Sequence, residues 1–223
     1  MTSITESLNS LRSSLPAGVT LVAVSKFHPV EALMEAYRAG QRAFGESRAQ
    51  ELALKVKAMP ADVEWHFIGH LQTNKVRAVV PHASLIHSID SERLLRAVDA
   101  EAVKEGIVVD VLLQVHVALE ETKTGFLPDD LLALANGPLP GELKGVRVRG
   151  VMGMASNVDD DARIRADFMA IADCFNRLKA TALGSQPHFS IISMGMSHDW
   201  PAAVECGANM VRVGTTIFGE REY

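Results

Sequence analysis

The chain has 223 residues, of which 48% are hydrophobic and 22% are charged, a composition typical of a globular protein with one domain or at most two small ones. This composition excludes disordered, collagen-like and coiled-coil proteins. The formal net charge of -5 gives no chain-wide positive field, so neither nucleic acid nor a membrane surface is expected as a partner. Cys174 and Cys206 lie in helix-like stretches without CxxC spacing, which indicates reduced thiols in the cytoplasm rather than disulfides or a zinc site.

The N-terminal segment, residues 1–16, carries Glu6 and several serines among its apolar positions. It therefore lacks the continuous apolar core of a signal peptide, and we expect a short amphipathic helix there. The chain contains no run of roughly 18 or more apolar residues, so a membrane-spanning helix is not expected either.

Short apolar runs rich in β-branched residues alternate along the chain with amphipathic helical patterns. The predicted strands cover residues 20–24, 43–46, 65–69, 85–89, 109–117, 146–152, 189–192 and 210–213. The predicted helices run from Pro29 to Gly40, through Leu52 and Val56, from about Gln72, after an N-cap at Asp90-Ser91, and over about 129–135, 160–182 and 201–207. The chain thus repeats a strand followed by a helix.

Eight such units in 223 residues match the (β/α)8 or TIM barrel, whose typical length is about 250 residues. The continuous apolar character of residues 109–117 is typical of a parallel strand covered on both faces. The alternative is an open doubly wound sheet, which usually has fewer strands and a GxGxxG turn after the first strand. That turn is absent, and no linker divides the chain. We therefore predict an α/β protein whose residues 1–223 form a single barrel domain.

Lys26 ends the first apolar run, VAVSK, and the carboxyl ends of the strands form the active site in a TIM barrel. Burial at such a place lowers the pKa of an ammonium group and exposes a nucleophilic amine, which can form a Schiff base with an aldehyde. The alternative is a surface lysine that extends from a strand end, and position alone favours that alternative.

Two loops rich in small residues follow the last two predicted strands: SMGMS at 193–197, ahead of a short helix with a cap expected near Asp199, and RVGTT at 212–216. Backbone amides and helix N-termini bind anions, and the loops after strands seven and eight commonly hold phosphate in this fold. The glycines could serve only as turn residues. Two small-residue loops at the two expected strands nevertheless favour a phosphate site.

A Schiff-base lysine and a phosphate site at one barrel mouth are the two groups that hold pyridoxal 5′-phosphate (PLP). Arg212 alternates with Gly214, so both positions face inward and the guanidinium could donate a hydrogen bond to the pyridine nitrogen. Arginine keeps its proton, so that nitrogen would stay unprotonated. An unprotonated ring is a weaker electron sink, so this geometry is expected to temper catalysis.

Five motifs carry a family likeness: VAVSK at 22–26, FGESRAQE at 44–51, WHFIGHLQTNK at 65–75, SMGMSHD at 193–199 and VRVGTTIFGER at 211–221. In this order, and over nearly the whole chain, they resemble the pyridoxal phosphate homeostasis proteins. The resemblance implies a barrel like the N-terminal domain of bacterial alanine racemase, covalently bound PLP and no established catalytic turnover.

Carried over to this chain, the resemblance makes Lys26 the Schiff-base lysine and Arg212 the partner of the pyridine nitrogen. It also implies that Ser197 and the backbone of Gly214 and Thr215 bind the phosphate. The remaining residues predicted to contact the cofactor are Ser47, Ser193, Gly195 and Met196.

Two segments depart from the family pattern. Ser47 and Arg48 stand where many relatives carry Asn-Tyr, so a contact made through that asparagine is not carried over. The loop HVALEETKTGF at 116–126 replaces the usual sequence after strand five, although Lys123 and Gly125 keep its last positions.

The histidines and methionines near strand ends are assigned more ordinary roles. His66 and His70 lack the carboxylate of an HExxH arrangement, so no metal site is expected. His198 is expected to be a helix-entry residue without a catalytic role. The methionines at strand ends can pack around a flat ring or simply fill the core: Met152, Met154, Met194 and Met196.

A racemase built on this barrel needs a second general base on the opposite face of the cofactor, which in alanine racemase is a tyrosine from a C-terminal β-domain. This chain has only Tyr37, on the first helix after the first strand, and Tyr223, and we expect no second domain of that kind. We expect a monomeric, non-catalytic protein that buffers PLP or delivers it to PLP-dependent apo-enzymes. The alternatives are a weak amino-acid racemase and a barrel enzyme that acts on a phosphorylated metabolite through a Schiff base.

Overall fold

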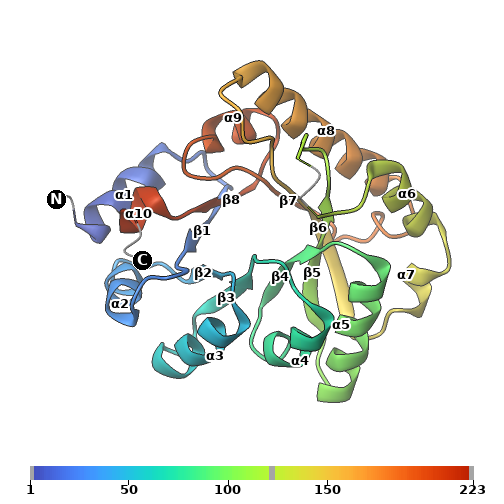
Figure 1. The fold of residues 1–223 in the computed structure, drawn as a ribbon, viewed down its shortest axis with the longest axis horizontal. Coiled ribbons are helices and arrows are strands. Elements are labelled where there is room, and N and C mark those ends of the chain that lie inside the picture. The colour runs from blue at the N-terminus through green and yellow to red at the C-terminus, as the bar shows by residue number, and fades with distance from the viewer. Residues whose placement is uncertain (1–2, 121–123, 221–223) are drawn as a thin grey trace.

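The computed structural model describes residues 3–120 and 124–220. Eight parallel strands follow one another in chain order and close into a barrel, because β8 pairs with β1. Figure 1 shows the strands around the centre of the molecule and the helices outside them. The predicted (β/α)8 barrel is confirmed.

The strands are β1 (Thr20–Val24), β2 (Ala43–Glu46), β3 (Glu64–Phe67), β4 (Leu85–Ile89), β5 (Val109–Val115), β6 (Val146–Gly153), β7 (Ile191–Ser193) and β8 (Met210–Val213). The helices are α1 (Ile4–Ser14), α2 (Val30–Arg38), α3 (Ala49–Ala58), α4 (Val76–Val79), α5 (Glu92–Glu105), α6 (Pro128–Asn136), α7 (Leu139–Glu142), α8 (Asp161–Lys179), α9 (Trp200–Glu205) and α10 (Thr215–Phe218), with a 3-10 turn η1 (Thr73–Lys75). The bounds predicted for β1, β2, β4 and β8 are confirmed.

The predicted bounds of the other strands are wrong by one to two residues at one end or both. After β5, the His116 amide donates to Phe126 O at 2.9 Å instead of continuing along β6. Before β7, Phe189 is buried by stacking on Phe175 of α8, with ring centroids 5.0 Å apart. An apolar run indicates burial rather than strand pairing, and Phe189 is buried by its contact with α8 instead of by a neighbouring strand.

Several helix predictions also need correction. The helix expected from Gln72 is a 3-10 turn followed by the single turn of α4, and α7 was not predicted. The long helix α8 ends at Lys179 rather than at 182, where the Thr181 hydroxyl donates to Leu178 O at 2.6 Å. Cys206 is the residue that ends α9 rather than a residue within it.

The first helix of the chain, α1, contacts the last, α10, beside β1 and β8 (Figure 1). The predicted N-terminal amphipathic helix is confirmed as α1, which begins with a capping box between Ser3 and Glu6. Ser91 caps α5 as predicted, since its hydroxyl accepts the Leu94 amide at 3.3 Å.

The hydrophobic core consists of two layers of buried side chains. The larger one fills the space between the strands and the helices, and the smaller one fills the barrel interior. The interior is therefore a packed core, as in other barrels of this type, and ligands can enter only at its ends. The interior layer consists of Val22, Ala43, Leu85, Leu112, Met152 and Met210. Within residues 3–120 and 124–220, no helix is long and apolar enough to cross a membrane.

Candidate cofactor site

A pocket of about 270 Å³ opens at the carboxyl ends of the strands. Seven of the predicted cofactor residues line it: Lys26, Ser47, Met196, Ser197, Arg212, Gly214 and Thr215. The other wall residues are Val24, Ile68, Met154 and His198. The structure therefore brings together residues from both ends of the chain.

The alternation of side chains along β1 and β8 explains why these residues face the pocket. Residues two apart on a strand share one face, so Val24 and Lys26 both face the pocket, as do Arg212 and Gly214. The pairing of β1 with β2 continues one residue past the strand, since the Ser25 amide donates to Gly45 O at 3.0 Å. Lys26 thus follows a segment that is still held in the sheet.

Arg212 is only 5% exposed and is held in one orientation by β6 and β7. Its Nη1 donates to Ser193 O at 2.8 Å and to Ser193 Oγ at 2.7 Å, and its Nη2 donates to Gly153 O at 3.1 Å. These contacts use three of the five N–H groups of a guanidinium. Burial lowers the pKa of Arg212 to about 10, while the charge of Asp199 opposes that shift. The side chain remains a cation at neutral pH.

The loops after β7 and β8 meet at the pocket. The Gly214 amide donates to Ser197 Oγ at 3.3 Å, and Thr215 begins α10 beside it. Asp199 is the N-cap residue of α9, as predicted, although its carboxylate makes no side-chain hydrogen bond to the first turn of that helix. It accepts the Met196 amide at 2.5 Å instead, which fixes the loop immediately before Ser197.

Ser193 and Gly195 lie behind the pocket wall rather than in it. Ser193 is fully buried and holds the Arg212 guanidinium, and Gly195 O accepts the Arg212 backbone amide at 3.0 Å. Both residues therefore support Arg212, and neither is among the residues that line the pocket.

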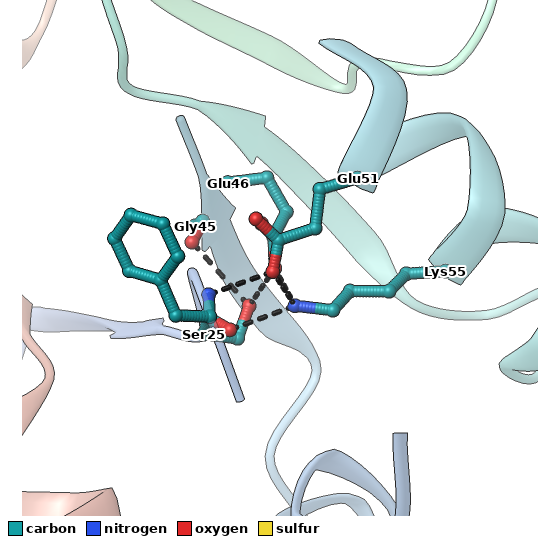
Figure 2. A network of polar contacts seen from close by, with 6 residues as sticks. Ser25, Gly45, Glu46, Glu51 and Lys55 are labelled. Atoms are coloured by element: carbon teal, nitrogen blue, oxygen red, sulfur yellow. Dashed lines mark hydrogen bonds and ion pairs between the residues drawn. The ribbon is translucent and has the colours of Figure 1, made fainter. Parts of the chain in front are cut away.

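A cluster of charges that was not predicted lies behind Lys26 and consists of Glu46, Glu51 and Lys55, of which Glu46 and Lys55 are buried. Figure 2 shows the two carboxylates and Ser25 converging on the Lys55 ammonium. Burial raises the pKa of Glu46, and the adjacent Lys55 opposes that rise. The i, i+4 spacing of Glu51 and Lys55 was visible in the sequence, but the contact with Glu46 across two elements was not.

Three further predictions can be compared with the structure. His198, predicted to be a helix-entry residue without a catalytic role, is a wall residue of the pocket, and Met154 lines the pocket as one of the two alternatives for it allowed. Arg48 places its guanidinium 4.5 Å from the centre of the Phe27 ring. Lys123 lies outside the described residues, whereas Gly125 lies close to the backbone of His116.

A larger pocket, about 530 Å³, opens at the opposite end of the barrel. Several of its wall residues are the first residues of strands, and two of its charged wall residues, Asp110 and Arg149, form an ion pair with each other. The amino-terminal end of a TIM barrel contributes to stability rather than chemistry, so we assign the site to the smaller pocket.

The donor set of the smaller pocket fits PLP. It contains one amine, one guanidinium, and the backbone amides and hydroxyls of Ser197, Gly214 and Thr215. These three residues are called the phosphate cup below. Ile68, Met154 and Met196 supply apolar walls that suit a flat ring. A Cβ at Gly214 would lie 3.1 Å from Val24 O, so the small residue keeps the cup open against β1.

Comparison with known proteins agrees with this geometry. The family described as alanine racemase, N-terminal domain, matches residues 1–222. The chain is 41% identical over 204 residues to the pyridoxal phosphate homeostasis protein of Aquifex aeolicus, which covers 91% of this chain and 87% of that protein. It is 39% identical over 229 residues to the protein of the same name from Schizosaccharomyces pombe, with 99% and 94% covered. The chain belongs to the pyridoxal phosphate homeostasis protein family.

Solved structures extend the same result. The chain is similar to PipY of Synechococcus elongatus with PLP bound, with 41% identity, a TM-score of 0.87, and 97% of this chain and 100% of that chain covered. An alanine racemase of Bartonella henselae is 17% identical with a TM-score of 0.75, and 98% of this chain and 58% of that chain are covered; this likeness shows a shared fold alone. The family resemblance expected from the five motifs is confirmed, and the roles of the individual pocket residues remain predictions.

Proposed function

We propose that this protein binds PLP covalently through Lys26 and takes part in intracellular PLP homeostasis. In this role it buffers a reactive aldehyde or delivers it to PLP-dependent apo-enzymes in the cytoplasm. The observation that carries the proposal is the shared pocket of Lys26, Arg212 and the Ser197 loop. The names of its relatives and the PLP-bound PipY structure support it.

Each pocket residue has one task in this proposal. The neutral amine of Lys26 attacks the aldehyde carbon of PLP, a C=N bond forms, and the aldehyde oxygen leaves as water. Ser197 Oγ and the backbone amides of Gly214 and Thr215 bind the phosphate oxygens. Arg212 donates a hydrogen bond to the pyridine nitrogen and, because it keeps its own proton, leaves that nitrogen unprotonated. PLP supplies an electron sink when bound, and this contact weakens it.

We also propose that the protein has no catalytic turnover. Racemisation needs a second base across the cofactor from the lysine. Tyr37 of α2 is directed elsewhere, since its hydroxyl donates to Asp62 at 2.7 Å, and no tyrosine of the described residues lines the pocket. His198 is the wall residue with the chemistry to act as such a base, so the weak-racemase alternative depends on it.

The first test is the covalent link. We expect protein incubated with PLP to show the visible absorbance of a lysine imine, and borohydride reduction followed by peptide mass mapping to place the label on Lys26. The Lys26→Ala variant loses both signals, whereas Lys57→Ala, at an exposed position of α3, keeps them. A label on another lysine, or no label, contradicts the proposal.

The second test separates a carrier from an enzyme. Holoprotein incubated with single L-amino acids in deuterated water is expected to show no exchange of the α-proton. Mixed with an apo-aminotransferase, it is expected to restore aminotransferase activity. Exchange that disappears in the His198→Ala variant would instead establish the racemase.

A further inference from the structure

The backbone around Lys26 has an unusual conformation. A turn encloses Lys26 and Phe27, with the His28 amide donating to Ser25 O at 3.1 Å. Phe27 has a φ of 68° and is the one non-glycine residue with positive φ within residues 3–120 and 124–220. Bulky residues avoid this left-handed region, so the surrounding contacts must hold the turn in place.

Two side chains of α3 hold the two peptide groups that flank the Lys26 Cα. Lys55 Nζ donates to Ser25 O at 2.8 Å on one side. Glu51 Oε1 accepts the Phe27 amide at 2.7 Å on the other side. Since these two peptide groups define the backbone torsions of Lys26, the ion pair fixes the direction in which the lysine side chain leaves the turn.

Glu46, Glu51 and Lys55 form one hydrogen-bonded cluster, called the clamp below. Besides Ser25 O, the Lys55 ammonium donates to Glu46 Oε1 at 2.7 Å and Glu51 Oε1 at 2.6 Å, and an ammonium has only three donors. The Lys55 and Glu46 side chains are 6% and 0% exposed. Ser25 Oγ adds a hydrogen bond of 2.5 Å to Glu46 Oε1. Figure 2 shows these groups gathered where α3 meets the ends of β1 and β2.

The clamp and the pocket lie on opposite faces of the β1 and β2 ends. Alternation along the chain turns Ser25 toward the clamp and Lys26 toward the pocket. None of Glu46, Glu51 and Lys55 is among the residues that line the pocket. The clamp can therefore affect the cofactor only through the lysine turn.

We propose that Glu51 and Lys55 are positioning residues that hold the Lys26 amine in line for attack on the PLP aldehyde. The inference rests on the proposed function and deepens it. It predicts that weakening the clamp slows formation of the covalent link, because a misplaced nucleophile loses the advantage of a fixed geometry. It also predicts that the phosphate and ring contacts, which other residues make, are preserved.

The test uses the full chain with two ligands, PLP and pyridoxine 5′-phosphate, which carries an alcohol in place of the aldehyde and forms no imine. We expect Glu51→Ala to slow imine formation with PLP by about tenfold or more and to leave the affinity for pyridoxine 5′-phosphate unchanged. Glu51→Gln keeps an acceptor oxygen for the Phe27 amide and should restore most of the rate. Lys57→Ala, on the exposed side of the same helix, is the matched control.

The outcomes distinguish this inference from the proposed function. If Glu51→Ala forms the imine at the wild-type rate, the positioning role is wrong and the proposed function stands. A parallel loss of pyridoxine 5′-phosphate affinity would assign the clamp to the shape of the whole pocket and would also overturn the inference. If the wild-type protein binds neither ligand, the proposed function itself fails. Should Glu51→Ala not fold, Glu51→Asp, which keeps the charge but withdraws the acceptor from the Phe27 amide, carries the same test.

Discussion

Lys55 shows how much of this structure depends on single buried groups. Its ammonium donates to two carboxylates and one backbone carbonyl. Moving these charges out of water costs several kcal/mol per ion, a cost that their mutual contacts offset. Removing one partner of such a cluster leaves the other charges buried without the ion pairs that offset the cost of their burial.

We therefore expect Lys55→Met to lower the free energy of unfolding by about 3–5 kcal/mol, because it leaves the Glu46 and Glu51 carboxylates together without a cation. Urea denaturation of the apo-protein measures this loss. Adding Glu46→Gln, which removes one of the two charges, should recover part of it. A single variant within about 0.5 kcal/mol of wild type, the range of ordinary surface substitutions, would show that the cluster has little energetic weight.

At the scale of elements, the loop between β7 and α9 shapes the cup. Gly195 has a φ of +94°, and a Cβ there would lie 2.7 Å from Ala203 Cβ. Met196 and Ser197 follow it directly. Gly207, after α9, has a φ of +103°, but a Cβ added there would meet no heavy atom within 4 Å apart from its chain neighbours. The two glycines share a backbone conformation and differ in their surroundings.

This pair allows a matched prediction. Gly207→Ala should cost only the backbone strain, about 1 kcal/mol, and should leave PLP affinity unchanged. Gly195→Ala should cost about 1–3 kcal/mol more, since α9 or the loop must shift to admit the methyl group, and should weaken PLP and pyridoxine 5′-phosphate binding together. Thermal unfolding and ligand titration of both variants measure these effects. Equal binding by the two variants would mean that the loop does not form the cup.

At the scale of the whole molecule, the fold and the inward-facing site residues could be predicted from the sequence, because strand alternation and strand ends are local properties. Lys26, Arg212 and Gly214 were placed in this way, and they line the pocket. Ser193 was predicted as a contact and lies behind the wall, because the orientation of Arg212 depends on three strands at once. The clamp on Lys26 escaped prediction for the same reason, since it joins a strand, a turn and a helix that sequence spacing does not relate.

A line of buried polar groups crosses the barrel interior. His66 Nδ1 lies 2.9 Å from His87 Nε2, and His87 Nδ1 lies 3.1 Å from Ser193 Oγ, which accepts the Arg212 guanidinium. His66 also lines the pocket at the amino-terminal end, whereas Arg212 lines the candidate site. Hydrogen bonds therefore connect the two ends of the barrel. Both imidazoles must be neutral here, since no carboxylate of the residues that the structure describes pairs with either ring, and each ring lies close to a buried cation or to the other ring.

This line gives the protein a specific sensitivity to acid. Burial lowers the pKa of His66 from 6.5 to about 4, and burial together with the charges of His66 and Arg212 lowers the pKa of His87 well below 6.5. Below pH 6.5 the unfolded chain takes up protons at both residues while the folded chain does not, so stability falls as the pH falls toward 4.

We expect His66→Gln, which retains a donor and an acceptor, to lose less stability than wild type between these pH values, by on the order of 3 kcal/mol for one histidine. Urea denaturation above pH 6.5 and near pH 4 measures the difference, and His188→Gln, at a half-buried position outside this line of polar groups, is the control. If His66→Gln and wild type lost stability equally as the pH falls, His66 would take up its proton in the folded protein as readily as in the unfolded chain. That result would contradict the lowered pKa of His66.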